Sequence, residues 1–286
     1  MRWQPGTRSR NLDDRRALRA PRGRAVGGGL GLGGLLAILA ISWFLGIDPT
    51  MFLGGGTGVG LGGGGSAISG GDVTSGAFQT TPEEEDLVDF ISFALDDLQE
   101  TWRELLPGYR DATLVLFRES TQSGCGVGQS QMGPFYCGAD EQVYIDLSFY
   151  AELRTRFGAP GDFAQAYVLA HEIGHHLQTL TGISENVRRQ QQADPDARNA
   201  LSVRQELQAD CFAGVWGYWT AQRGNLEPDD VEEGLRAAAA IGDDRIQRMG
   251  GRGVHPESFT HGSSAQRVEW LRRGLESGDP DSCKTS

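Results

Sequence analysis

Two histidines and a glutamate in the middle of the chain have the spacing of a metal site. His171, Glu172 and His175 form the pattern HExxH, and apolar residues surround it at helical spacing. Residues four positions apart lie on one face of a helix, so both imidazoles can bind one zinc ion. Glu172 can then reach the metal-bound water and act as general base, while the zinc polarises a scissile carbonyl. The pattern predicts a hydrolase that uses one Zn²⁺ per chain.

A catalytic zinc needs a third protein ligand and an open position for water. The best candidates are Glu206 and Asp210, which are also four residues apart on an apolar helical stretch. Burying two carboxylates on such a helix is costly unless cationic groups meet them. A zinc ion would meet one carboxylate, and the N–H of a ligand imidazole would meet the other. The spacing alone leaves these two roles interchangeable.

Two further histidines, His255 and His261, lie in a loop late in the chain. Either could donate a hydrogen bond to the oxyanion of a tetrahedral intermediate. We predict this catalytic role for His261 and an ordinary loop position for His255. The stretch from Tyr144 to Leu147 is predicted to be an edge strand that pairs with an extended peptide substrate.

The first quarter of the chain lacks the composition of a globular fold. Residues 1–26 carry eight Arg against two Asp, and we assign them as a basic cytoplasmic N-terminus. Residues 27–47 belong to an uncharged apolar stretch long enough to cross a bilayer as one transmembrane helix, and no convincing cleavage site follows it. The positive-inside rule then predicts a single-pass membrane protein with an extracytoplasmic body. Residues 48–79 are rich in Gly and are predicted to be a flexible linker.

Residues 80–286 have the mixture of apolar and charged residues expected of one domain. Thr81 can cap a helix that opens with acidic residues, and Asp162 can cap the helix that carries HExxH. Periodicity predicts further helices over residues 184–192, 196–223, 228–249 and 264–275. It also predicts two buried strands, over residues 114–117 and 143–147. The domain is therefore predicted to be α+β, mostly helical with a small sheet.

The body is acidic, with 18 basic residues against 36 acidic ones from residue 27 onward. Such a surface repels phosphates, so we expect no nucleic-acid partner. The four cysteines have no close CxxC spacing, which leaves a zinc ribbon unsupported. In an exported domain we expect a bridge between Cys125 and Cys137 across their short Gly-rich loop, and therefore a second bridge between Cys211 and Cys283.

Several stretches resemble the bacterial membrane-anchored neutral zinc metallopeptidase family. They are residues 1–4, 13–16, 133–137, 171–176, 206–211 and 259–263, together with the apolar span. This resemblance implies a zincin-like fold in which the active-site helix packs under a small sheet. The chain is also similar to gluzincin peptidases. Their third zinc ligand is a Glu, followed four residues later by an Asp that orients a ligand histidine. Those roles fall here on Glu206 and Asp210.

These observations predict a zinc peptidase that acts on peptide or protein substrates and is held at a membrane by its N-terminal helix. HExxH does not select the acyl group, so a zinc-dependent amidase of non-protein substrates is one alternative. The other is a membrane-tethered zinc module without catalysis, in which the base is usually lost. Glu172 is present, which favours an enzyme.

Overall fold

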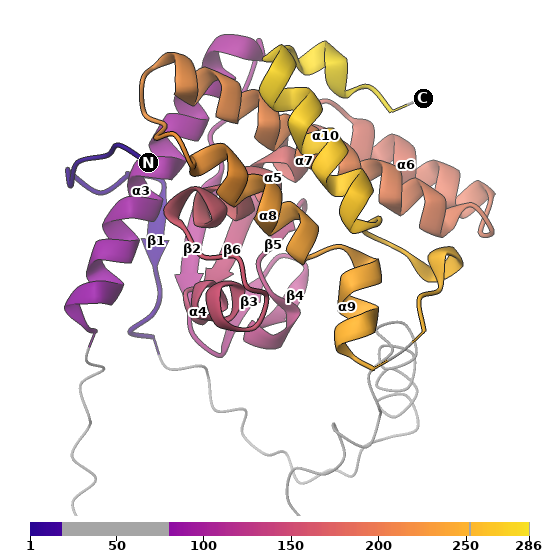
Figure 1. The fold of residues 1–286 in the computed structure, drawn as a ribbon, viewed down its shortest axis with the longest axis horizontal. Helices are drawn as coiled ribbons and strands as arrows, with labels where there is room; N and C mark the ends of the chain where they lie inside the picture. Colours follow the sequence, from indigo (N-terminus) through magenta and orange to yellow (C-terminus); the bar gives the residue numbers. More distant parts are fainter. Residues whose placement is uncertain (19–79, 252, 286) are drawn as a thin grey trace, which may run out of the picture. The chain divides into compact units, whose positions relative to one another are not determined.

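The computed structural model describes residues 1–18, 80–251 and 253–285 (Figure 1). Helices surround a small sheet and make up most of the regular structure of the described residues, as predicted. In chain order the elements are β1 Leu12–Asp14, α3 Pro82–Leu105, β2 Thr113–Phe117, β3 Ser120–Ser123, β4 Gly126–Gln129, η1 Ser130–Met132, β5 Phe135–Cys137, β6 Gln142–Asp146, α4 Ser148–Thr155, α5 Asp162–Leu180, α6 Ile183–Ala193, α7 Arg198–Gln222, α8 Asp230–Ala240, α9 Asp243–Met249, η2 Pro256–Ser258, α10 Ser264–Ser277 and η3 Pro280–Cys283.

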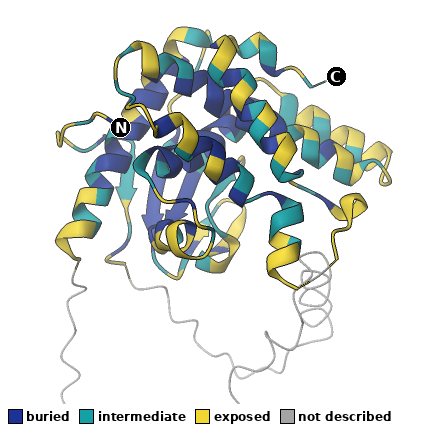
Figure 2. Ribbon diagram, in the orientation of Figure 1, coloured by how far each residue is buried: buried dark blue, intermediate teal, exposed yellow. Residues whose placement is uncertain are grey.

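Four strands form the main sheet in the order β1-β2-β6-β5. β1, β2 and β6 are parallel, and β5 runs antiparallel to β6. Side chains alternate between its faces. One face, including Leu114 and Ile145, joins the helical core, while Val115 and Tyr144 face the other side, where Phe135 packs. Figure 2 shows β2 and β6 as buried strands at the centre of the molecule.

The prediction that the stretch from Tyr144 to Leu147 is an edge strand was wrong. β6 lies between β2 and β5, and β5 provides the sheet edge on that side. The sequence concealed β5 because it contains only three residues inside a Gly-rich stretch, too few to show an alternating pattern. The predicted strand itself is present as β6, one residue earlier at each end.

Helices α5 and α7 lie against each other at an unusually close approach. A Cβ atom at position 174 would lie 2.9 Å from the Cα atom of Ala209, so Gly174 allows the two backbones to meet. On the far side of α7, a Cβ atom at position 274 would lie 2.0 Å from the carbonyl oxygen of Cys211. α10 therefore packs as closely on α7 as α7 does on α5.

Residues 1–18 pack against the body, although the sequence placed them in a separate cytoplasmic segment. The backbone of β1 pairs with β2, and the ring of Trp3 lies 5.4 Å from that of Phe90 on α3. Arg16 is only 3% exposed and lies 2.9 Å from Glu85 and 3.2 Å from Glu84. Because these partners lie about 70 residues away in the chain, the basic composition of the segment gave no sign of them.

The α-amino group of Met1 is also buried in this unit. It lies 2.6 Å from Asp162 at the start of α5 and 3.1 Å from Asp230 at the start of α8. Asp162 is the first residue of α5, and Gly161, with φ of 123°, takes the capping position that we predicted for Asp162.

The predicted transmembrane helix and linker, residues 27–47 and 48–79, lie outside the described residues. Among the described residues, the structure contains no helix with the length and apolarity needed to span a membrane.

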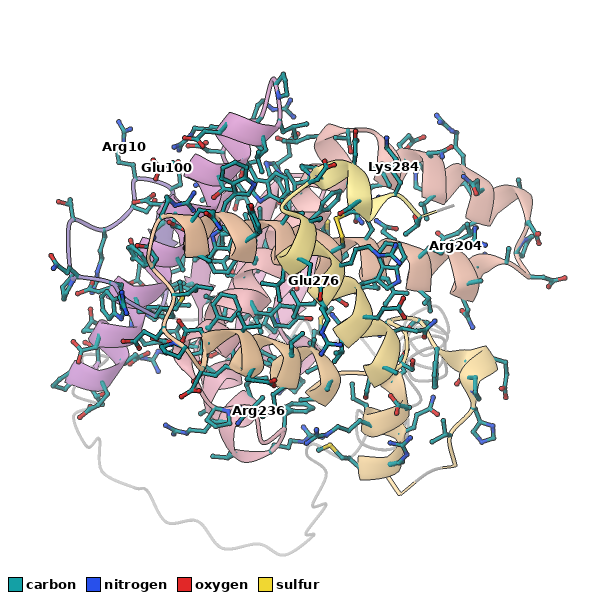
Figure 3. The ribbon with its side chains drawn as sticks, turned by 45° about the horizontal axis from the view of Figure 1, so that its top comes forward. Arg10, Glu100, Arg204, Arg236, Glu276 and Lys284 are labelled. Atoms are coloured by element: carbon teal, nitrogen blue, oxygen red, sulfur yellow. A yellow bond between two sulfur atoms is a disulfide. The ribbon has the colours of Figure 1, made fainter. Side chains whose placement is uncertain are left out.

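Figure 3 shows six charged side chains that are exposed on the folded part: Arg10, Glu100, Arg204, Arg236, Glu276 and Lys284.

Both predicted disulfides are present, Cys125 with Cys137 and Cys211 with Cys283. The helix predicted over residues 228–249 is divided into α8 and α9. A Cβ atom at Gly242 would lie 2.3 Å from the backbone nitrogen of Ser264, so the chain turns there to admit the start of α10. Asp244 then accepts a hydrogen bond from that nitrogen at 2.7 Å.

Candidate active site

A cleft of about 730 Å³ runs past the HExxH helix. Its walls come from the η1–β5 stretch, α4, α5, the start of α6, α7, α9, and the loop that precedes α10. His171, Glu172, His175, Glu206 and His261 all line it. The structure therefore brings together, at one cleft, residues from three segments that are far apart in the sequence.

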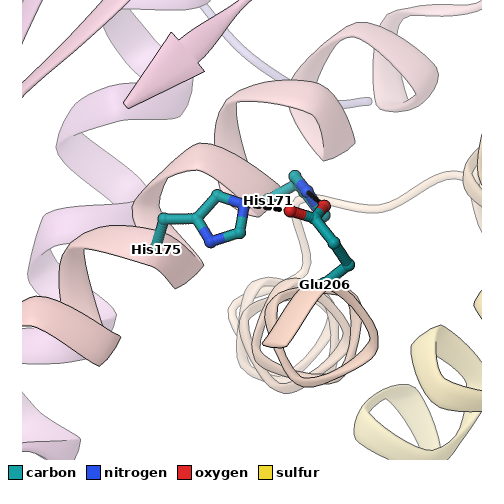
Figure 4. Close-up of side chains that lie close together, drawn as sticks. All are labelled: His171, His175 and Glu206. Carbon is teal, nitrogen blue, oxygen red and sulfur yellow. Dashed lines mark hydrogen bonds and ion pairs between the residues drawn. The ribbon is translucent and has the colours of Figure 1, made fainter. Parts of the chain in front are cut away.

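Two imidazoles and one carboxylate converge at the base of the cleft (Figure 4). The Nε2 atom of His171 lies 3.1 Å from Glu206 Oε2, and the Nε2 atom of His175 lies 3.5 Å from Glu206 Oε1. One ligand atom from each residue lies within 4.8 Å of the others. Two ligands of a tetrahedral zinc at ~2.1 Å are roughly 3.4 Å apart, so these donors fit the ion.

The opposite nitrogen of His171 faces Asp210. His171 Nδ1 lies 2.8 Å from Asp210 Oδ1, and the hydroxyl of Tyr167 donates to the same oxygen at 2.5 Å. Arg267, on α10, donates to both oxygens of Asp210 at 2.8 Å. Burial raises the pKa of the Asp210 carboxyl, but the charges of Arg267 and His171 outweigh burial and lower it to about 2. Asp210 is thus a fully buried, ionised acceptor for the imidazole N–H.

His175 is oriented by an amide in the same way. Its Nδ1 lies 2.9 Å from the side-chain oxygen of Gln178, one turn further along α5. The amide nitrogen of Gln178 donates to the backbone oxygen of Gln205 at 2.7 Å and to Gln208 at 3.1 Å. The Gln178 oxygen must therefore accept, so the His175 Nδ1 carries the proton and its Nε2 is free to bind a metal.

The charges at the converging ligands perturb their protonation. Burial lowers the pKa of His171, but the carboxylates of Asp210 and Glu206 raise it to about 10. Burial raises the pKa of Glu206, and the neighbouring histidines hold it well below its ordinary value. In the metal-free protein these carboxylates therefore favour the protonated form of His171, which binding of a cation would oppose.

Glu172 is buried and lines the cleft beside the ligands. The hydroxyl of Tyr150, on α4, is also buried and has no hydrogen-bond partner among the described residues. The pKa of Tyr150 is raised by burial and then by the negative charge of Glu172. An unpartnered donor thus lies within electrostatic reach of the carboxylate that we predict to be the base.

The structure separates the two late histidines. The side chain of His261 lines the cleft, with Nδ1 3.2 Å from Asp243 Oδ1, and Asp243 also accepts the backbone N–H of His261 at 2.7 Å. Burial lowers the pKa of His261, and the hydrogen bond to Asp243 together with the charge of Glu206 raises it overall. His255 is exposed, contacts Glu257 and does not line the cleft.

Four supporting residues escaped the sequence analysis: Tyr167, Gln178, Asp243 and Arg267. Tyr167 lies four residues before His171, and Gln178 three residues after His175, so helical spacing alone could have found these two. Asp243 and Arg267 lie on α9 and α10. No local pattern connects them with HExxH, because only the packing of those helices brings them to the site.

Comparisons with known proteins agree with this chemistry. The profile of a family described as "putative neutral zinc metallopeptidase" matches residues 1–286. The chain belongs to this family. This is the family that the sequence resembled, and the family implies zinc as the cofactor.

Relatives of this chain occur in Escherichia coli and Mycobacterium tuberculosis. The chain is similar to "Uncharacterized protein YpfJ" of Escherichia coli K12, with 46% identity over all of this chain and 98% of the relative. It is similar to "Uncharacterized protein Rv2575" of Mycobacterium tuberculosis, with 44% identity over 66% of this chain and 67% of the relative. No solved structure matches the chain, so the zincin-like fold expected from the sequence stays a prediction.

Proposed function

We propose that this family member is a zinc-dependent peptidase that hydrolyses peptide bonds. Its zinc ligands are His171, His175 and Glu206, and Glu172 is its general base. The observation that carries the proposal is the pairing of ring nitrogens with carboxylates. Both Nε2 atoms face Glu206, whereas Asp210 faces only the opposite nitrogen of His171. This geometry favours Glu206 as the direct ligand and Asp210 as the residue that orients His171.

Zinc at this site would supply a Lewis acid and lower the pKa of its water. Glu172 accepts a proton from the attacking water and transfers it to the leaving amine. Asp210 and Gln178 hold the ring N–H groups of His171 and His175 and so keep both Nε2 atoms toward the cleft.

The oxyanion of the tetrahedral intermediate is assigned to His261. Its ring lines the same cleft, and its Nδ1 pairs with Asp243, which leaves Nε2 as the donor toward the substrate. Asp243 favours the protonated ring, as its hydrogen bond to His261 raises the pKa of that histidine.

Replacing Glu172 by Gln tests the mechanism. Glu172→Gln removes the proton acceptor but keeps the shape of the side chain, so zinc content should remain near one per chain. Turnover of casein or a peptide library should fall by a factor of about 10² to 10⁴. Glu100→Gln, at an exposed position on α3, is the matched control and should retain full turnover.

Three results would each point elsewhere. Wild-type turnover by Glu172→Gln would refute the assigned base. Cleavage of small non-protein amides without cleavage of any peptide would favour the amidase. Zinc binding without hydrolysis of either class would favour a non-catalytic zinc module.

We also propose that the domain works in an oxidising compartment outside the cytoplasm, which its two disulfides favour. The packing of residues 1–18 on the body adds a constraint. A single crossing by residues 27–47 would leave the two on opposite sides of a membrane. We therefore propose that residues 1–18 and the body lie on the same, outer side.

Two exposed positions test this topology, Arg10 in the N-terminal segment and Lys284 near the C-terminal end. A cysteine at either position should react with a membrane-impermeant maleimide on intact cells. Labelling of Lys284→Cys alone would instead support the single crossing with a cytoplasmic N-terminus.

A further inference from the structure

The two ends of the cleft differ in chemistry along α5. One turn before the catalytic pair, Val168 lines the cleft, and one turn after His175, Thr179 does so. The lining from the η1 stretch, α4 and α9 contains the large apolar side chains Met132, Phe149, Phe157 and Ile246, with Glu152 and Arg156 beside them, and we call it the apolar end. The lining near the end of α5 comes from the beginnings of α6 and α7 and is polar, with the ring of Tyr136 from β5 close to Thr179.

Side chains at the apolar end form a continuous surface. The rings of Phe149 and Phe157 are 6.5 Å apart, and a Cβ atom at Gly133 would lie 3.8 Å from the ring of Phe149. Arg245 on α9 donates to the backbone oxygen of Phe157 at 2.7 Å, which holds Ile246 beside this wall.

Two of the apolar lining residues are largely open to solvent. Met132 is 60% exposed and Ile246 is 43% exposed, and both line the cleft. Large apolar side chains exposed together at a catalytic cleft lose contact with water when a ligand covers them. This end of the cleft therefore suits a bulky apolar group.

The polar end offers hydroxyl and amide groups instead. The side-chain nitrogen of Gln205, which directly precedes Glu206, donates to Ser184 at 3.1 Å. Ser202 and Thr179 line the cleft beside them. Tyr136 is bulky, but its hydroxyl contacts His176 at 3.0 Å, so a large hydrophobic side chain placed here would gain less than at the apolar end.

The arginines that line the cleft do not favour a negatively charged ligand. Its two arginines already have acidic partners, since Arg267 pairs with Asp210 at 2.8 Å and Arg156 pairs with Glu152 at 3.5 Å. The difference in polarity between the two ends is therefore the feature best able to orient a substrate.

We propose that the site prefers peptides with a large aliphatic or aromatic side chain on one side of the scissile bond and a small or polar side chain on the other. The large side chain lies against Phe149 and Phe157 and against the exposed side chains of Met132 and Ile246. This inference rests on the proposed peptidase function. Differences of one or a few methylene groups in such pockets change kcat/KM by roughly 10- to 200-fold, so Leu or Phe should exceed Ala by about that factor.

The first test uses a peptide library digested by the zinc-loaded full chain, with the cleavage sites sequenced. Bulky apolar residues should be enriched on one side of the cut only. Equal enrichment on both sides, or on neither side while peptides are cleaved, would overturn the proposal.

The second test changes the exposed part of the apolar wall. Met132→Ser and Ile246→Ser alter exposed side chains, so the fold should persist. Each should reduce the ratio of kcat/KM for the Leu peptide over the Ala peptide by about 10-fold. Val254→Ser, at an apolar position that is 38% exposed and not part of the cleft lining, is the matched control and should leave this ratio unchanged. An unchanged ratio in both cleft variants would contradict the assignment.

A binding measurement separates this inference from the proposed function. Two zinc-binding hydroxamates that differ only in an isobutyl or a methyl substituent should bind the zinc-loaded protein with different Kd. The isobutyl compound should bind at least 10-fold more tightly, and Ile246→Ser should remove most of that advantage. If the advantage holds while no peptide is cleaved, the peptidase function fails and the apolar subsite stands. Equal binding of the two compounds would refute the subsite.

Discussion

Helices α5 and α7 and the N-terminal segment both depend on partners far away in the sequence, yet the sequence indicated the partners of the first only. His171 meets Glu206 across 35 residues, and Arg16 meets Glu85 across 69. The difference lies in how many partners each group could choose. Few sites in the chain suit a buried zinc, whereas 36 acidic residues in the body could have accepted an arginine. Long-range contacts are predictable when the chemistry of the group leaves few possible partners.

The largest expected effect comes from removing residues 1–18. Their loss deletes β1, exposes the edge of β2 and leaves the acidic first turn of α3 without Arg16. Domains of this kind are stable by only about 5–15 kcal/mol, so residues 80–286 alone should lack a cooperative thermal transition. Circular dichroism during heating provides the measurement.

A peptide of residues 1–18 added in trans should restore part of that transition. If residues 80–286 alone melt at the temperature of the full chain, the N-terminal segment is an accessory and the comparison above collapses.

The next largest effects should come from substitutions that distinguish the role of Glu206 from that of Asp210. Glu206→Ala removes the carboxylate that we propose as the third zinc ligand, so metal and activity should vanish together in metal analysis and peptide assays. Asp210→Asn should retain zinc at high metal concentration and lose about 10- to 100-fold in affinity or activity. The reverse result, with zinc lost in Asp210→Asn and held in Glu206→Gln, would exchange the two roles.

Arg267 provides a test of a contact that the sequence did not reveal. Its removal leaves the buried Asp210 without its main cationic partner, and breaking a buried pair in this way costs about 3–5 kcal/mol. Arg267→Met should therefore lower the free energy of unfolding of the metal-free protein by about that amount in urea titrations. Arg236→Met, on the exposed face of α8, should change it by less than about 0.5 kcal/mol. Equal effects would show that the Asp210 pair contributes nothing special.

The smallest expected effect is the pH dependence of zinc binding. In the metal-free protein the pKa of His171 is raised to about 10, so zinc displaces a proton at neutral pH. Apparent zinc affinity should rise by about tenfold per pH unit between pH 7 and 9, measured against a competing chelator. A flat profile would contradict the proton that we place on His171.

The raised pKa of His171 affects the stability of the metal-free protein in the opposite direction, because that stability falls as pH rises. Since the pKa of His171 is raised on folding, its contribution to stability is complete below the unfolded value of about 6.5. It is lost as pH rises through about 10. Metal-free protein should therefore lose stability over the range in which zinc binding strengthens.

By itself, the sequence determined the features that depend on helical periodicity and on metal chemistry. HExxH fixed the spacing of two histidines on α5, and the pair Glu206 and Asp210 repeated that spacing on α7. The Gly-rich loop between Cys125 and Cys137 similarly indicated a local disulfide. In each case the residues that matter lie within about a dozen positions, so their relative placement is largely set by local geometry.

Only the tertiary structure decided which carboxylate faces Nε2, that Arg267 and Asp243 belong to the site, and that β5 rather than β6 forms the edge. It also brought β1 into the sheet. These outcomes depend on how α7, α9 and α10 pack on α5 and on pairing between strands separated by long stretches of chain. Such contacts are selected by the free energy of the whole core, and no short window of sequence contains that information.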